Sequence, residues 1–304
     1  MSIEWFTWSN PVAVWWAFLL AVSSANIALW LLLHRHFQKR ISGVRAGLFR
    51  IEMMVLLCAA YVFGCAFRSI LPRADVQRIA LFDTWLSSVM VGRTVATIAE
   101  VCFVIQWAIV LRQLGKWVKS DTVNNVSLTI VPLILIAELC SWYAVITTNY
   151  LGNAIENSLW AVTFALIAVA LARLLYEFHG LARLAIGAKI AGVGCYLAFL
   201  VTVDVPMYLT RWRADLATGK ELLSIFSGLY DLGTRWAVTH DFAHWQEEIA
   251  WMSLYFSFAV WSSLALCGFE LVKHHLPRYR RRMTALPSPA RRAVLVRVSS
   301  GRGA

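Results

Sequence analysis

The amino-acid sequence predicts an all-α fold, a polytopic membrane protein built as a bundle of seven transmembrane helices. Three observations predict it. The 304 residues are 60% hydrophobic and only 15% charged, and the mean hydropathy is +0.63. Apolar runs recur at about 20 residues, the length that crosses the ~30 Å hydrocarbon core of a bilayer. The chain also holds 15 tryptophans, a residue type enriched at membrane interfaces.

Each apolar run is assigned to one span, and the seven spans cover residues 12–33, 51–70, 84–111, 126–148, 154–176, 186–208 and 247–271. The longest connection, 209–246, contains an apolar patch from Leu222 to Tyr230 that predicts a short helix on the membrane surface. We expect one seven-helix domain, residues 1–276. A basic tail, 277–304, follows it, and its prolines, serines and arginines are typical of disordered segments.

The connections alternate in basic content, and this alternation predicts the orientation. Loops 34–50, 112–125 and 173–189 are basic, as is the tail, so they are expected on the cytoplasmic side. The N-terminus is then outside and the C-terminus cytoplasmic. Loop 69–83 has balanced charges and contributes little to this assignment. The pattern is typical of a multi-pass protein of a bacterial-type inner (cytoplasmic) membrane.

The net charge of +11 belongs mainly to the C-terminal segment. Residues 273–304 hold nine basic residues and no acid, which leaves 19 basic against 17 acidic residues elsewhere. Such a segment predicts contact with anionic lipid at the cytoplasmic surface, and offers a site for a membrane-protein partner. Nucleic acid is disfavoured as a partner, because the tail has neither interleaved aromatic residues nor a recognisable fold.

Two cofactor classes are disfavoured by the positions of lysine and histidine. A retinal Schiff base needs a lysine inside the last span, and 247–271 contains none. A transmembrane haem needs histidines deep within the spans, whereas every histidine of this chain is expected at a span end or in a loop. The six cysteines fall in apolar runs without metal-site spacing, so they are interpreted as core residues.

Ionisable groups inside a membrane span are costly and often functional, and five of those in the predicted spans are taken as candidates: Arg93, Glu100, Glu138, Glu156 and Asp204. Arg93 and Glu100 share one helical face but lie ~10 Å apart along the axis, so each is expected to find its partner on another helix. The polar residues of 138–149 and 153–160 form stripes on adjacent helices, and the stripes are expected to face each other or a shared cavity. Pro206 predicts a bend beside Asp204. The alternative for each of these residues is a structural hydrogen bond or ion pair between helices.

The start of the last span carries a candidate metal site. His240 and His244 are one helical turn apart, with Glu247 on the same face, and this spacing can present two imidazoles and a carboxylate to a divalent transition metal. The alternative is that both histidines merely sit in the polar interface. At these two positions the chain resembles the seven-helix membrane hydrolases of the alkaline ceramidase and progestin-receptor-like group. The second span lacks the further histidine of that group, so the family is not assigned.

Three functional hypotheses follow. The first is a metal-dependent membrane enzyme acting on a lipid or small amphiphile at the outer leaflet, with Glu138, Glu156 and Asp241 as candidate catalytic groups. The second is a non-enzymatic binder or transporter of a small solute, in which Arg93 and Glu100 are central and the histidines peripheral. The third is a structural subunit of a membrane complex.

Overall fold

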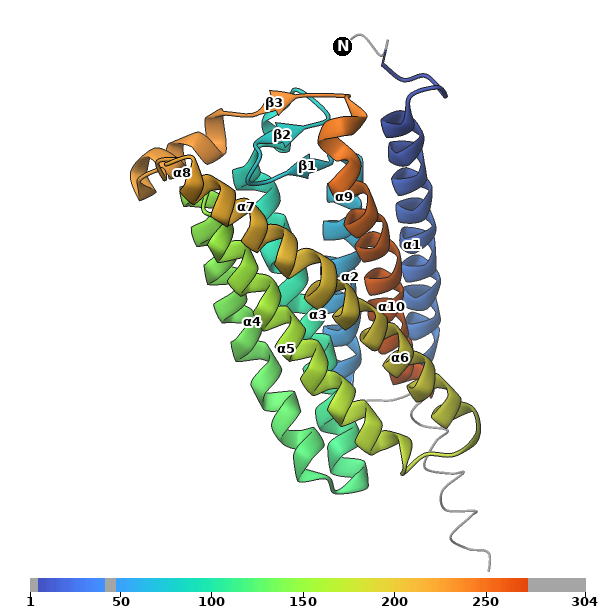
Figure 1. Ribbon diagram of the computed structural model, residues 1–304. Coiled ribbons are helices and arrows are strands. Elements are labelled where there is room, and N and C mark those ends of the chain that lie inside the picture. The colour runs from blue at the N-terminus through green and yellow to red at the C-terminus, as the bar shows by residue number, and fades with distance from the viewer. Residues whose placement is uncertain (1–4, 42–47, 273–304) are drawn as a thin grey trace, which may run out of the picture.

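The computed structural model describes residues 5–41 and 48–272 and confirms an all-α bundle (Figure 1). Seven of its helical segments are long and apolar enough to cross a membrane. The predicted tail, 277–304, lies outside the described residues, so its disorder and its partners stay predictions. The cytoplasmic assignment of the basic loops stays a prediction as well.

The first five spans are single helices, and the last two are each interrupted by a π-helical turn. The first five are α1 (Pro11–Ile41), α2 (Leu48–Ile70), α3 (Val89–Val118), α4 (Asp121–Thr147) and α5 (Tyr150–Leu175). The sixth span consists of α6 (Gly180–Phe199), a π turn (Leu200–Asp204) and α7 (Val205–Ala217), and the seventh of α9 (Phe242–Leu254), a π turn (Tyr255–Ala259) and α10 (Val260–Val272). Most spans extend past the predicted bounds, because backbone hydrogen bonding continues beyond the apolar run into polar sequence, whereas α3 begins at Val89, later than the predicted residue 84.

The π turn in the sixth span ends at Asp204, two residues before Pro206. Proline has no backbone N–H, so it cannot close the α-helical bond to the carbonyl four residues earlier. The ladder here changes to the wider π pattern at Leu200–Asp204. The bend expected beside Asp204 therefore takes the form of a π turn, a feature that often occurs at functional sites.

The helices pack in sequence around the bundle. Each of the first five spans packs against the next, α5 also contacts α6 and α7, and α10 returns to α2 and α3. A continuous apolar core fills the interior along α2, α3, α4 and α5. Many large apolar side chains stay exposed on the outer surface of the bundle, as expected for helices facing lipid.

The turn between α4 and α5 holds these two helices close together. Thr148 adopts the left-handed conformation that ends α4, and the side chain of Asn149 caps α5 by accepting from the Leu151 amide. Gly152 then lies so near α4 that a Cβ there would be 2.8 Å from the Cys140 carbonyl oxygen. The close approach brings the polar stripes of both helices to one side of the bundle.

A small sheet covers the end of the bundle where loops 69–83 and 209–246 meet, here called the sheet end (Figure 1). Strands β1 (Arg73–Ala74) and β2 (Ile79–Ala80) form an antiparallel hairpin, and β2 pairs in parallel with β3 (Ala237–Val238). The short helices η1 (Trp85–Ser87) and α8 (Ile225–Thr234) complete this end. A helix is thus present where the 222–230 patch predicted one. The two loops share one end of the bundle, and that this end faces outside stays a prediction.

Candidate functional site

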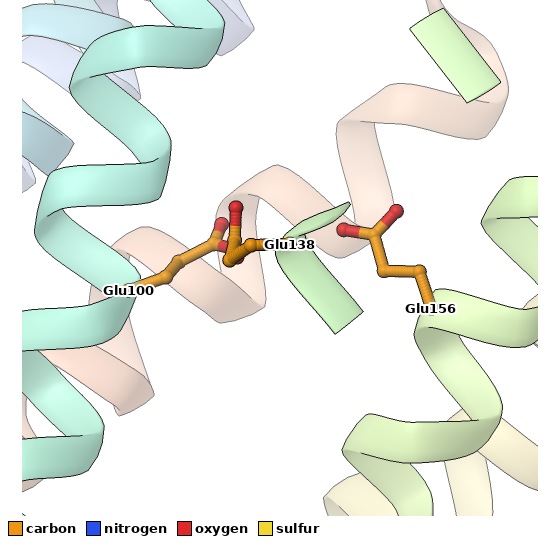
Figure 2. Close-up of side chains that lie close together, drawn as sticks. All are labelled: Glu100, Glu138 and Glu156. Atoms are coloured by element: carbon orange, nitrogen blue, oxygen red, sulfur yellow. The ribbon is translucent and has the colours of Figure 1, made fainter. Parts of the chain in front are cut away.

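The centre of the candidate site is the guanidinium group of Arg93 on α3. Its Nη2 atom lies 2.7 Å from Oε2 of Glu138, 3.1 Å from Oε1 of Glu156 and 3.4 Å from Oε2 of Glu100. All four side chains are buried. Three helices contribute one carboxylate each (Figure 2), and all three carboxylates contact the same guanidinium nitrogen. We call these four residues the Arg93 cluster.

The contact between Arg93 and Glu100 corrects the expectation that the two are too far apart to meet. The axial separation of their backbones does not include the reach of two long side chains. Side chains on a helix also lean toward its N-terminus, which directs Glu100 toward Arg93. The other part of the expectation is confirmed, because Arg93 also binds carboxylates on α4 and α5.

Neutral side chains fix two of the carboxylates. The hydroxyl of Thr97 donates to Oε2 of Glu138 at 2.6 Å and accepts from the indole of Trp142 at 3.1 Å. The amide of Asn153 donates to Oε2 of Glu156 at 3.2 Å. These contacts hold the acids in the orientation in which they meet Arg93.

The Arg93 cluster has more negative than positive groups. One guanidinium against three carboxylates gives a formal charge of −2 when all four are ionised. Excess charge buried away from water costs several kcal/mol per ion, about the cost that proton uptake removes. The cluster is therefore suited to binding protons or a further cation.

The same three carboxylates could serve as metal ligands. One oxygen of each glutamate lies within 4.8 Å of the others, and oxygen donors suit hard divalent cations. Nη2 of Arg93, however, contacts all three carboxylates. With Arg93 in this position, the guanidinium supplies the positive charge that a metal ion would supply.

Next to the Arg93 cluster lies a cavity of about 90 Å³ between the helices. Its walls include Arg93, Glu100 and Glu156 from the cluster, and Asp204 from the π turn of the sixth span. Aromatic side chains complete much of the wall, among them Trp160, Tyr196, Tyr208, Trp251 and Tyr255. The cavity thus combines several charged groups with aromatic faces.

The hairpin of the sheet end supplies a second set of charged groups to this cavity. Asp75 accepts a hydrogen bond from Nε of Arg73 at 2.9 Å and lies 3.9 Å from Nη2 of Arg68. Burial raises the pKa of Asp75, but the positive charges of Arg68, Arg73 and Arg93 outweigh burial and hold it below its usual value. Burial lowers the pKa of Arg73 to about 10, against the opposing effect of Asp75. Both groups are therefore ionised at neutral pH.

Gly92 makes room for Arg73. A Cβ atom at residue 92 would lie 1.2 Å from Cζ of Arg73 and within 1.5 Å of both terminal nitrogens. The guanidinium therefore packs directly on the backbone of α3, one residue before Arg93. Nη1 and Nη2 of Arg73 have no hydrogen-bond partner among the described residues.

Glu248 and Asp204 bring two further acids to the cavity wall. Glu248 is buried and accepts hydrogen bonds from the side chains of Gln77 and Trp251. Asp204 makes no hydrogen bond or ion pair within residues 5–41 and 48–272. A carboxylate without a partner inside a membrane span is the kind of group that marks a ligand or proton site.

A buried arginine attaches the hairpin to the rest of the sheet end. Nε of Arg78 lies 2.7 Å from Oδ2 of Asp231 on α8, and Nη2 donates to the carbonyl oxygen of Val145 at 2.6 Å. Nη1 donates to the carbonyl of Asp75 at 2.6 Å. Arg78 thus connects the hairpin to α8 and to the end of α4.

The histidine pair and its neighbours lie apart from the cavity wall, at the beginning of the last span. His240 stacks on Trp5 with 4.2 Å between ring centroids, and its Nε2 lies 2.9 Å from the Leu81 carbonyl oxygen. His244 is exposed and lies 3.6 Å from Asp241. The predicted metal set of His240, His244 and Glu247 stays a prediction.

The carboxylates near these histidines already have other partners. Asp241 caps α9 by accepting from the Ala243 amide at 3.0 Å. Glu247 forms an ion pair with Arg211. The structure thus brings together five predicted residues, Arg93, Glu100, Glu138, Glu156 and Asp204, around one cavity. It leaves His240, Asp241, His244 and Glu247 outside that wall.

The sequence reasoning missed the contribution of loop 69–83. Arg73, Asp75 and Gln77 of this loop line the cavity, together with Arg68 from the last turn of α2. Their balanced charges looked like those of an exposed loop. The sequence did carry one indication, because residues 68–78 hold three arginines and one aspartate, an unusually high density of charge for a short connection between spans.

No protein-family model, curated protein or solved structure matches this chain, so a functional assignment depends on the geometry of the site itself.

Proposed function

We propose that this integral membrane protein is a non-enzymatic transporter. It binds a small polar solute in the cavity and exchanges protons at the Arg93 cluster. One observation carries the proposal: Nη2 of Arg93 lies within 3.4 Å of three carboxylates, on the wall of a polar cavity inside the helical bundle. Isolated packing interactions would not need three acids for one base.

The position of the Arg93 cluster supports proton exchange. Protonating one glutamate removes repulsion from its two neighbours and weakens its attraction to Arg93. A solute that enters the cavity changes the electrostatic field at Glu100 and Glu156, which also line it. Solute binding and proton binding are therefore coupled energetically, and any such coupling is reciprocal.

The experiment uses proteoliposomes that contain a pH-sensitive dye. Pools of amino acids, amines, carboxylates or sugars are added outside, and the internal pH is followed. We expect one pool to move protons in the wild type and to fail in Glu100→Gln, which keeps the side-chain shape but cannot exchange a proton. Glu177→Gln is the matched control, since Glu177 lies beyond the end of α5 and pairs with Arg173 in its last turn. If no pool moves protons, or if Glu100→Gln keeps the full flux, the proposal is wrong.

A second candidate is a metal-dependent membrane enzyme that acts on a lipid or small amphiphile. The observation in its favour is the spacing of Glu100, Glu138 and Glu156, whose ligand atoms lie within 4.8 Å of one another. Elemental analysis of the purified protein tests it. A stoichiometric divalent metal that is lost in Glu138→Gln supports this candidate, and a metal lost only in His240→Ala and His244→Ala would instead locate it at the histidine pair.

A further inference from the structure

We propose that the cavity binds a small zwitterion that carries one carboxylate and one ammonium group, the chemistry of a free amino acid. This inference rests on the proposed function, because the zwitterion would be the solute that is carried. Its evidence is independent of the Arg93 cluster, however. It comes from two unsatisfied groups of opposite charge on the cavity wall.

The anionic end is recognised by Arg73. This side chain is 0% exposed, yet Nη1 and Nη2 both have no partner within the described part of the chain. Buried polar groups are rarely left unpaired in folded proteins. The Nε atom is already used by Asp75, so the donors left without a partner in the described part of the chain are the two terminal nitrogens, which lie next to Gly92. These two nitrogens can donate two hydrogen bonds to a carboxylate.

Arg68 adds positive charge to the same end of the cavity. It is 5% exposed, its Nε atom also lacks a partner among the described residues, and its guanidinium lies 5.6 Å from the ring centroid of Trp251. Arg68 and Arg73 together face one carboxylate, Asp75. With Glu248, which accepts from the Trp251 indole, the two arginines face two acids, so an anionic group would be held by the unpartnered arginine nitrogens and not by an excess of positive charge.

The cationic end is recognised by Asp204. Its carboxylate makes neither hydrogen bonds nor ion pairs with the described residues. Nearby on the wall, Oδ1 of Asn153 is buried without a partner, and Tyr196 and Tyr208 present aromatic rings. An ammonium group has three donors for such oxygens, and aromatic faces attract cations.

A ligand with a single charge satisfies only one of these ends. A simple anion leaves Asp204 unpaired, and a simple cation leaves Arg73 unpaired. A zwitterion pairs both and adds no net charge to the interior of the membrane. The cavity of about 90 Å³ limits the ligand to a small molecule.

Isothermal titration calorimetry on the purified full-length protein can separate these possibilities. The probes are L-alanine and L-leucine, each compared with the acid that lacks the amine (propionate, 4-methylpentanoate) and the amine that lacks the carboxylate (ethylamine, 3-methylbutylamine). We expect at least one amino acid to bind while both of its analogues bind about tenfold more weakly or worse. If an analogue binds as well as its amino acid, or if neither amino acid binds, the inference is overturned.

Two variants assign the ends of the ligand. Asp204→Asn removes no internal contact, so it should fold, and it should weaken amino-acid binding about tenfold or more. Arg73→Lys keeps the positive charge but removes the pair of terminal nitrogens. We expect it to weaken amino-acid binding to a similar extent. The matched control is Asp215→Asn, which alters an acid of α7 that pairs with Lys220, and it should bind normally. Unchanged affinity in Asp204→Asn contradicts the assignment even if Arg73→Lys fails to fold.

The inference and the proposed function can fail separately. Binding of leucine without any proton movement in proteoliposomes would retain the zwitterion site and overturn the transport proposal. Proton movement driven only by the amine or carboxylate pool would retain transport and overturn the zwitterion.

Discussion

Gly92 and Arg73 are mutually dependent, because the guanidinium of Arg73 occupies the space where any other residue at position 92 would place its Cβ atom. That Cβ would lie 1.2 Å from Cζ of Arg73. The absent side chain on α3 thus determines where a buried charge of the hairpin is located. The cavity wall depends on this packing as much as on the charged residues themselves.

Gly92→Ala is therefore expected to displace Arg73 and to weaken both stability and ligand binding. Overpacking a buried position costs about 1–3 kcal/mol, and the displaced guanidinium loses its position beside Asp75. Thermal unfolding in detergent measures the first effect and calorimetry with leucine the second. Gly194→Ala on α6 is the control, because a Cβ there meets nothing within 4 Å. Equal behaviour of the two variants would contradict the prediction.

Asp231→Ala is expected to destabilise the sheet end strongly. It removes the carboxylate that pairs with buried Arg78, and breaking a buried ion pair by removing one partner costs about 3–5 kcal/mol. Protease susceptibility of the 209–246 connection and the thermal midpoint should both report the change. Arg235→Ala provides the comparison, since Arg235 contacts the same aspartate with a side chain that is 76% exposed. That exposed pair is worth about 0–1 kcal/mol.

Asp75 predicts a pH dependence of stability with a definite sign. Burial opposes ionisation, but Arg68, Arg73 and Arg93 hold the pKa of Asp75 in the folded protein below its ordinary value of 3.8. A lowered pKa stabilises the fold above the ordinary value, and that contribution is lost as the pH falls through the lowered pKa. Asp75→Asn should therefore lower the thermal midpoint at neutral pH, and its difference from wild type should shrink below about pH 4. If the difference in thermal midpoint between Asp75→Asn and the wild type grew toward acid pH, the prediction would be wrong.

The two histidines of the last span should respond differently to substitution. His240→Ala loses the stacking on Trp5 and the contact with the Leu81 carbonyl, a cost of about 1–3 kcal/mol. His244→Ala changes an exposed side chain and should stay within about 0.5 kcal/mol. Unfolding curves for both variants, measured with and without added Zn²⁺, check this. If both variants were less stable than the wild type by the same amount, and only when Zn²⁺ is present, the result would instead support the predicted metal pair.

The sequence was sufficient to predict the spans, because twenty apolar residues have few alternatives to crossing a bilayer. It also singled out Arg93, Glu100, Glu138 and Glu156, since an ionisable residue in a span is conspicuous. Span number and adjacency followed from composition and from the short turn before α5. The bounds of α1 and α6 were less predictable, because both helices extend into polar sequence.

The arrangement of the cavity could not be predicted in the same way. Residues 73–80 are too short and too polar to resemble strands, yet β1 and β2 pair with each other, and β2 also pairs with β3, more than 150 residues later. The burial of Arg73 depends on the missing side chain at Gly92, a tertiary relationship that no local pattern encodes. His240 and His244 had suggestive spacing, but ring stacking and exposure are decided by residues elsewhere in the chain.

The two π turns have a geometric consequence for the helices that contain them. A π turn holds one residue more than an α turn, and one residue corresponds to about 100° of rotation around a helix axis. The faces of the sixth and seventh spans therefore change phase at Leu200–Asp204 and at Tyr255–Ala259. A helical wheel drawn through either whole span would assign Asp204 or Glu248 to the wrong side relative to α6 or α10. Deleting one residue within the turn of the seventh span would restore a uniform α-helix and rotate α9, the cavity-facing half, out of alignment with α10.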